Sequence, residues 1–109
     1  MSDLNGKTIA IISTNGFEDS ELTSPKEAVE SAGAATKIVS TETGEIEGKK
    51  GAKVSVDETT ADASVDEFDA LILPGGTTNA DTIRTDKDAV ALVKAFKDAG
   101  KPIGVICHG

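Results

Sequence analysis

The chain has 109 residues, of which 38% are hydrophobic, and a formal net charge of −8 at pH 7. This length suffices for one small domain with a buried core, and the negative charge disfavours binding to nucleic acid or to anionic membrane surfaces. The single cysteine excludes an intramolecular disulfide, and no apolar run approaches the ~18 residues of a membrane span. The first residues lack the apolar stretch of a signal peptide, so we expect a cytoplasmic protein.

Predicted strands and helices alternate from the start of the chain. Residues 7–13 are mostly apolar and predict a buried strand, which leads into a polar loop and then a helix. Ser24 and Glu27 have the spacing of a capping box, and Pro25 would occupy the first helical position. Local rules therefore start the helix at Ser24. A start near Asp19 would leave Pro25 inside the helix, which is expected to end at Gly33.

Extended segments dominate the middle of the chain. Residues 35–40 predict a second strand, and the charged segments 45–49 and 52–56 predict a small hairpin on a sheet edge. Residues 68–73 are apolar enough for another buried strand, which ends sharply at a Pro-Gly-Gly turn.

The last third predicts one more helix and one more strand. Apolar residues recur with helical spacing between Asp86 and Ala99, and a short apolar strand, residues 102–106, follows the next turn. Alternating strands and helices without a repeat or linker imply a single domain. We expect a flavodoxin-like three-layer α/β/α sandwich with a mostly parallel sheet.

Chemically distinctive residues follow three of the buried strands. Glu18 follows the first strand, Gly76 follows the third, and Cys107 and His108 follow the last. Parallel strands place such residues at one edge of a sheet, where α/β proteins bind ligands. Alone, each feature has an ordinary explanation: a packed cysteine, a surface histidine, a solvated glutamate or a common turn. Their combination indicates a catalytic site.

A nucleophilic role for Cys107 is consistent with thiol chemistry. The thiolate is the reactive form of cysteine, and the positive N-terminus of a helix lowers the thiol pKa from about 8.5. A protonated Glu18 could donate a hydrogen bond to the sulfur, whereas an ionised one would oppose the thiolate. The backbone N–H groups of Gly76 and His108 are candidate oxyanion donors.

Four segments resemble the PfpI-type intracellular cysteine protease family, which lies in the larger superfamily of the parkinsonism-associated deglycase and the class I glutamine amidotransferases. The resemblance spans the whole chain and is carried by residues 16–22, 68–76, 79–84 and 100–109. It implies that Cys107 is the nucleophile on a strand-to-helix elbow, that Glu18 hydrogen-bonds its sulfur, and that His108 is the general acid/base. It further implies that an acidic residue of a neighbouring subunit, Asp81 here, orients the histidine. We therefore expect a homo-oligomer with a cross-subunit site.

The chain departs from related patterns in two ways. An esterase elbow has glycine two residues before the nucleophile, where Val105 stands here. Chains of the resembled family usually continue for several tens of residues. We therefore expect residues 1–109 to be the amino-terminal part of a single PfpI-like domain, truncated just after the nucleophile elbow and unable to fold stably or catalyse alone.

The resemblance implies a cytoplasmic stress-protection hydrolase that acts through a covalent intermediate on Cys107. Its substrates would be peptide or amide bonds, methylglyoxal-type dicarbonyls or glycated amines. The alternative is a non-catalytic redox-sensing or chaperone-like stress protein that uses the oxidisable Cys107. Glutamine amidotransfer ranks last, because that chemistry takes its histidine and glutamate from beyond the cysteine.

No metal or cofactor is expected. One cysteine and one histidine fall short of the three or four protein ligands of a zinc site, unless subunits share it. Neither the Gly-x-Gly-x-x-Gly fingerprint nor a phosphate-binding Gly-Lys-Ser/Thr loop occurs in the sequence.

Overall fold

The computed structural model describes residues 6–14, 19–48, 50–51, 53–73 and 84–105 of the chain. A five-stranded parallel sheet forms the middle layer, and a two-stranded antiparallel hairpin lies beside it. In sheet order the strands are β5 (Glu58–Thr59), β2 (Ala35–Ser40), β1 (Thr8–Ile12), β6 (Ala70–Leu73) and β7 (Ile103–Val105). The hairpin consists of β3 (Glu45–Glu47) and β4 (Lys53–Ser55).

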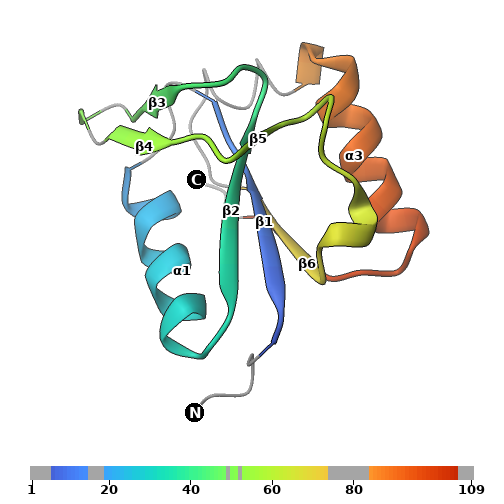
Figure 1. Cartoon of the computed structure of the whole chain (residues 1–109), viewed down its shortest axis with the longest axis horizontal. Helices are drawn as coiled ribbons and strands as arrows, with labels where there is room; N and C mark the ends of the chain where they lie inside the picture. The colour runs from blue at the N-terminus through green and yellow to red at the C-terminus, as the bar shows by residue number, and fades with distance from the viewer. Residues whose placement is uncertain (1–5, 15–18, 49, 52, 74–83, 106–109) are drawn as a thin grey trace.

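Helices cover both faces of this sheet, α1 (Asp19–Ser31) on one side and α3 (Lys87–Asp98) on the other (Figure 1). A 3-10 helix, η1 (Val65–Glu67), precedes β6 and packs near α3. The order β2-β1-β6-β7 follows the flavodoxin-like arrangement, in which the chain moves to one side of the first strand and then to the other. The expected three-layer fold with a mostly parallel sheet is confirmed.

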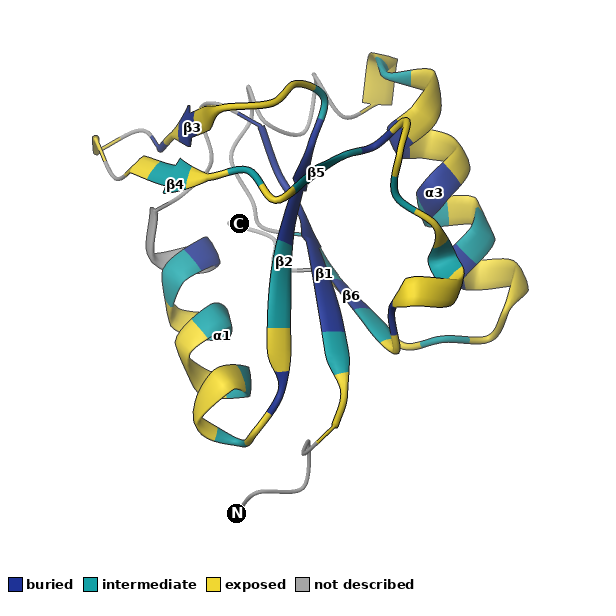
Figure 2. Ribbon diagram, viewed as in Figure 1, coloured by how far each residue is buried: buried dark blue, intermediate teal, exposed yellow. Residues whose placement is uncertain are grey.

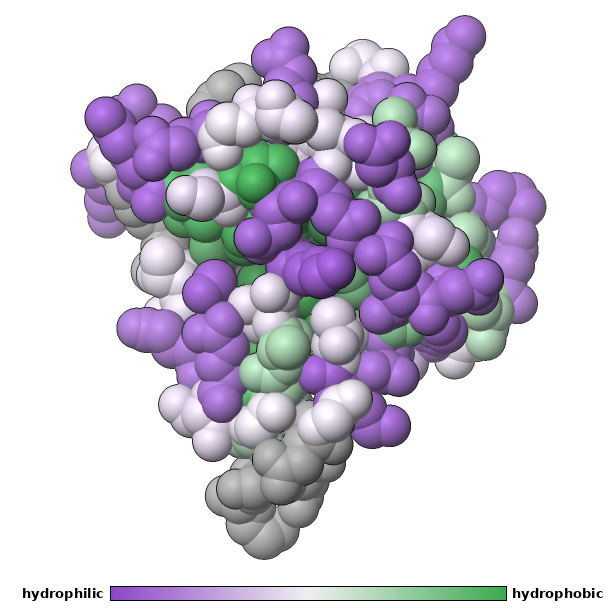
Figure 3. Space-filling view, in the orientation of Figure 1, coloured by the Kyte–Doolittle hydropathy of each residue, from purple (hydrophilic) through white to green (hydrophobic). Residues whose placement is uncertain are grey.

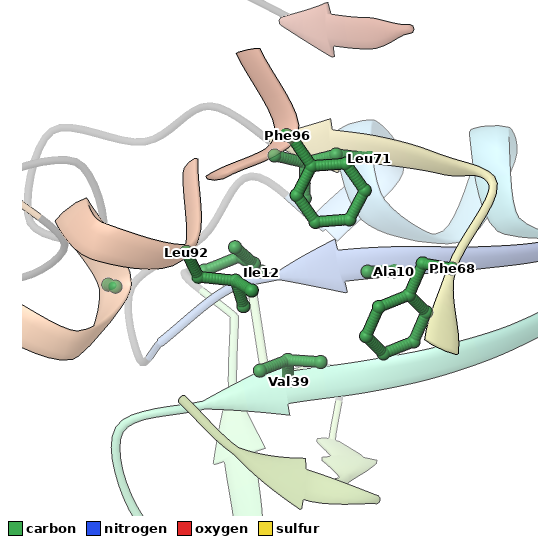
Figure 4. Packing of buried hydrophobic residues seen from close by; sticks show 8 residues of the cluster. Ala10, Ile12, Val39, Phe68, Leu71, Leu92 and Phe96 are labelled. Carbon is green, nitrogen blue, oxygen red and sulfur yellow. The ribbon is translucent and has the colours of Figure 1, made fainter. Parts of the chain in front are cut away.

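Alternate residues of β1 supply the two halves of the core. Ala10 and Ile12 point to the α3 side, whereas Ile11 points to the α1 side, as the two-residue period of a strand requires. On the α3 side the rings of Phe68 and Phe96 stack with centroids 6.1 Å apart (Figure 4). Buried residues concentrate in the central strands and along α3 (Figure 2), which fixes the sheet between its covering layers.

The helix start expected at Ser24 is wrong. Helix α1 begins at Asp19, so that Pro25 lies inside it. The earlier turn buries Leu22 completely, in a cluster with Ile11 and Ile38. Burying a leucine stabilises the fold by about 1.5–3 kcal/mol, which is comparable to the ~3 kcal/mol cost of a proline inside a helix. Tertiary burial therefore offsets the local preference.

A capping box does occur in the structure, at Ser64. The Ser64 hydroxyl accepts from the N–H of Asp66 at 3.3 Å, and the Ser64 N–H donates to a Glu67 carboxylate oxygen at 2.8 Å. This box begins η1, which the sequence analysis did not anticipate although its spacing matches that of residues 24–27. Strand β5 was also missed, because two residues are too few to show a period.

Candidate functional site

Three neighbouring strands end at the same level of the sheet. In the parallel register Ile11 is level with Ile72, and Leu73 is level with Val105. Strands β1, β6 and β7 therefore finish side by side at the carboxyl edge. In parallel α/β sheets this edge is where ligands bind.

The five predicted site residues lie outside the described residues: Glu18, Gly76, Asp81, Cys107 and His108. The structure does describe the strand ends that precede their segments. Glu18 comes four residues after Thr14, Gly76 three after Leu73, and Cys107 two after Val105. These segments leave the sheet from adjacent strands, and the roles assigned to the five residues stay predictions.

Hydroxyl side chains are concentrated at this edge and were not recognised in the sequence. In the described part of the chain, the buried polar side chains are Ser13, Thr14, Ser40 and Thr60. Ser13 follows β1 directly, and its N–H donates to the carbonyl of Val39 at 3.0 Å. The N–H of Thr60 donates to the carbonyl of Ser40 at 2.8 Å. The available signal for Ser13 and Ser40 was their position directly after apolar residues; Thr60 follows a polar segment and gave no such signal.

Asp86 joins the start of α3 to this edge. One carboxylate oxygen of Asp86 accepts from the N–H of Asp88 at 3.1 Å and caps the helix. The other accepts from the hydroxyl of Thr60 at 2.9 Å. The carboxylate thus satisfies a free N–H of the helix and complements its positive end. The same contact fixes α3 against the end of β5.

Two aspartates set the register at the amino ends of their strands. The Asp69 carboxylate accepts from the N–H of Thr8 at 2.9 Å, while the Asp69 N–H donates to the Thr8 carbonyl at 2.7 Å. Asp57 makes the same pair of bonds with Ile38, at 2.7 and 2.8 Å. Because register is fixed along a whole strand, these pairs determine where β6 and β5 end.

Surface pairs account for the resolved pKa shifts. Hydrogen bonds from Thr36 and then Lys26 lower the pKa of Glu30. A hydrogen bond to the Glu58 carboxylate and its negative charge raise the pKa of Lys37. These groups lie on α1 and the first half of β2, away from the carboxyl edge.

Glu67 in η1 also has a lowered pKa, because the backbone N–H of Ser64 donates a hydrogen bond to its carboxylate. Hydrophilic side chains cover much of the face shown in Figure 3, which agrees with the high content of charged residues. The resolved shifts thus reflect structural pairing on the surface.

Within the described ranges, no group of three or more His, Cys, Asp or Glu side chains is placed to hold a metal ion. None of the helices found there is long and apolar enough to cross a membrane. The expected absence of metal and cofactor stays a prediction for the complete protein.

Comparisons with known proteins identify the relatives of this chain. The Bacillus subtilis protein named "Putative cysteine protease YraA" is 42% identical over 104 residues, which are 94% of this chain and 61% of that protein. "Deglycase TK1284" of Thermococcus kodakarensis is 41% identical over 101 residues, 93% of this chain and 60% of that protein. The chain thus spans about three fifths of the length of these relatives.

Solved structures and a family profile give the same result. The structure of oxidized DJ-1 from Toxoplasma gondii superposes with a TM-score of 0.84 at 27% identity, covering 94% of this chain and 56% of that one. The profile of the DJ-1/PfpI family matches residues 7–109. The resemblance found in the sequence is therefore confirmed: the chain belongs to the DJ-1/PfpI family.

Proposed function

We propose that the complete protein is a cytoplasmic cysteine-dependent hydrolase that protects against carbonyl stress. The observation that carries this proposal is that Ile12, Leu73 and Val105, the last residues of β1, β6 and β7, lie at a common level of the sheet. In the sequence, the segments with Glu18, Gly76 and Cys107 follow these strand ends. Two relatives support the reaction class, since one is named a cysteine protease and the other a deglycase. We include peptide or amide bonds, methylglyoxal-type dicarbonyls and glycated amines as substrates.

The proposed chemistry begins with attack by the Cys107 thiolate on a carbonyl carbon. A carbon–sulfur bond forms, and the carbonyl electron pair moves to the oxygen, which the N–H groups of Gly76 and His108 stabilise. With an amide, collapse of this intermediate expels the amine, which takes a proton from His108. With methylglyoxal, the attacked aldehyde carbon has no leaving group; His108 instead transfers the proton of that carbon to the neighbouring carbonyl carbon, which gives a lactoyl thioester. Water then cleaves the thioester and regenerates the thiol.

The charge state of Glu18 follows from the same scheme. An ionised carboxylate next to the sulfur would repel the thiolate, whereas a protonated one donates a hydrogen bond to it. Protonated Glu18 thus favours the reactive form of Cys107, and an uncharged amide donor at this position would preserve part of that effect. Glu18→Gln should impair turnover without unfolding the protein.

Substitution of the nucleophile tests the proposal directly. Cys107→Ser in the complete protein should lower the turnover of methylglyoxal by about 10³-fold or more, because an alcohol is far less ionised than a thiol. Lactate formation measures the rate. Ser55→Ala serves as the control, because it removes a hydroxyl from an exposed position on β4 while leaving the cysteine in place. Unchanged turnover in the cysteine variant would exclude the proposed mechanism.

A redox or chaperone-like role is the second candidate. The observation in its favour is that the Toxoplasma gondii relative was solved in an oxidized form. The low-pKa thiolate that attacks a carbonyl is also the form that peroxide oxidises. Turnover that depends on substrate, in the absence of any oxidant, would favour the hydrolase, whereas reversible oxidation of Cys107 without turnover would favour the sensor.

A further inference from the structure

The side chain of Lys101 makes two short hydrogen bonds to the backbone. Its partly buried ammonium group donates to the carbonyl of Val65 at 2.8 Å and to the carbonyl of Phe68 at 2.6 Å. These carbonyls belong to η1 and to the residue that ends it, just before β6. Hydrogen bonds from a charged donor are stronger than neutral ones, and a cation complements the negative C-terminal end of a helix.

The backbone of Lys101 lies where α3 ends and β7 is about to begin. Its N–H donates to the carbonyl of Phe96 at 3.0 Å, in the last turn of α3. The carbonyl of the next residue, Pro102, accepts from the N–H of Leu71 in β6 at 3.0 Å. Residues 101 and 102 therefore connect the helix to the amino ends of two neighbouring strands.

In the part of the chain that the structure describes, β7 is held by its pairing with β6 and by the packing of Ile103 against the core. The strand has three residues, and in the register of β6 its Ile103 is level with Leu71. Gly104 is exposed and has no side chain to pack. The stacked rings of Phe68 and Phe96 hold η1 against α3, and Lys101 bonds to the backbones of both of these residues. The position of so short a strand depends strongly on the residue before it.

We infer that Lys101 is a positioning residue for the nucleophile: by joining η1, α3 and the start of β7, it sets the level at which β7 ends beside β6, two residues before Cys107 in the sequence. This inference rests on the proposed function, because it takes Cys107 as the reacting group. Displacement of a reacting group by about 1 Å can cost on the order of 100-fold in rate. Lys101 acts only through the strand and does not itself touch the substrate.

The test compares Lys101→Met with Lys101→Arg in the complete protein. Methionine keeps an apolar side chain of similar length but donates no hydrogen bond, whereas arginine keeps the charge and the donors. Lys94→Met is the control, because it makes the same chemical change at an exposed site on α3, where Lys94 pairs with Asp98 at 3.0 Å. Folding is followed by circular dichroism.

The main readout is the rate of alkylation by iodoacetamide as a function of pH. Cys107 is the single cysteine of residues 1–109. The alkylated peptide that contains Cys107 is quantified by mass spectrometry, so that a cysteine elsewhere in the complete protein does not contribute to the profile. We expect Lys101→Met to move the midpoint of this profile towards that of free cysteine and to lower kcat with methylglyoxal about tenfold or more. Lys101→Arg and Lys94→Met should stay within about twofold of the parent protein.

Each outcome decides the inference. A folded Lys101→Met variant with the parent alkylation profile and kcat would overturn it. If Lys101→Met does not fold, Lys101→Arg decides: parent stability with the parent profile supports a positioning role, and parent stability with a shifted profile refutes it. Should the parent protein turn over no carbonyl substrate, the proposed function fails, while the alkylation profiles still test the position of Cys107.

Discussion

Glu30 shows how a single side chain makes stability depend on pH. One oxygen of its carboxylate accepts from the ammonium of Lys26 at 3.0 Å and from the hydroxyl of Thr36 at 2.5 Å, so its pKa lies below the ordinary value of 4.5. A carboxyl group with a lowered folded-state pKa adds stability above its unfolded-state pKa and loses it as the pH falls through the folded-state value. The contribution should therefore begin to fall near pH 4.5 and be lost as the pH drops further, through the lower folded-state pKa.

Glu30→Gln should accordingly flatten the acid side of the stability curve. Between about pH 5 and pH 3, the free energy of unfolding should fall less in this variant than in the parent chain, as measured by urea unfolding. The side chain is 39% exposed, so the effect will be modest. Glu27→Gln removes an exposed carboxylate from the same helix and serves as the control. Equal slopes for the parent and Glu30→Gln would contradict the assignment.

At the scale of elements, two serines with the same spacing to a glutamate have opposite roles. Ser24 lies inside α1, whereas Ser64 caps η1. Ser24→Ala should therefore raise stability by about 0.5 kcal/mol, because alanine has the higher helix propensity. Ser64→Ala should lower it by about 1 kcal/mol, because the N–H of Asp66 loses its acceptor. Thermal unfolding followed by circular dichroism measures both, and destabilisation by Ser24→Ala would mean that α1 begins at Ser24 after all.

Apolar periodicity was sufficient to find most elements. Strand β2 has the predicted bounds, and α3 differs from its predicted range by one residue at each end, because regular burial leaves a local pattern in the sequence. The start of α1 could not be found in this way, since Leu22 is buried by residues of three separate strands, Ile11, Ile38 and Ile46. The parallel edge was predictable from the order of strands and helices. Two sets of side-chain hydrogen bonds could not be predicted, because their partners lie more than 20 residues apart in the sequence. Asp86 accepts from Thr60, and Lys101 donates to the carbonyls of residues 65 and 68.

At the scale of the whole molecule, the family resemblance supports a proposal about the subunits that form the site. We propose that the active form is a homo-oligomer in which Asp81 orients His108 of the partner subunit. Asp81→Ala should then lower turnover while leaving Cys107 in place. An active monomer in sedimentation under assay conditions would refute the cross-subunit site.

Mixing the Cys107→Ser and Asp81→Ala variants tests the arrangement more sharply. Cys107→Ser retains Asp81, and Asp81→Ala retains Cys107, so a mixed dimer contains one site with both residues only if they come from different subunits. Random pairing makes half of the dimers mixed, each with one complete site of two, and should restore about a quarter of the parent activity. If both residues belong to one subunit, mixing adds no complete site and activity stays at the level of the separate variants. Mixing is done by unfolding and refolding the two chains together, with each variant refolded alone as the control.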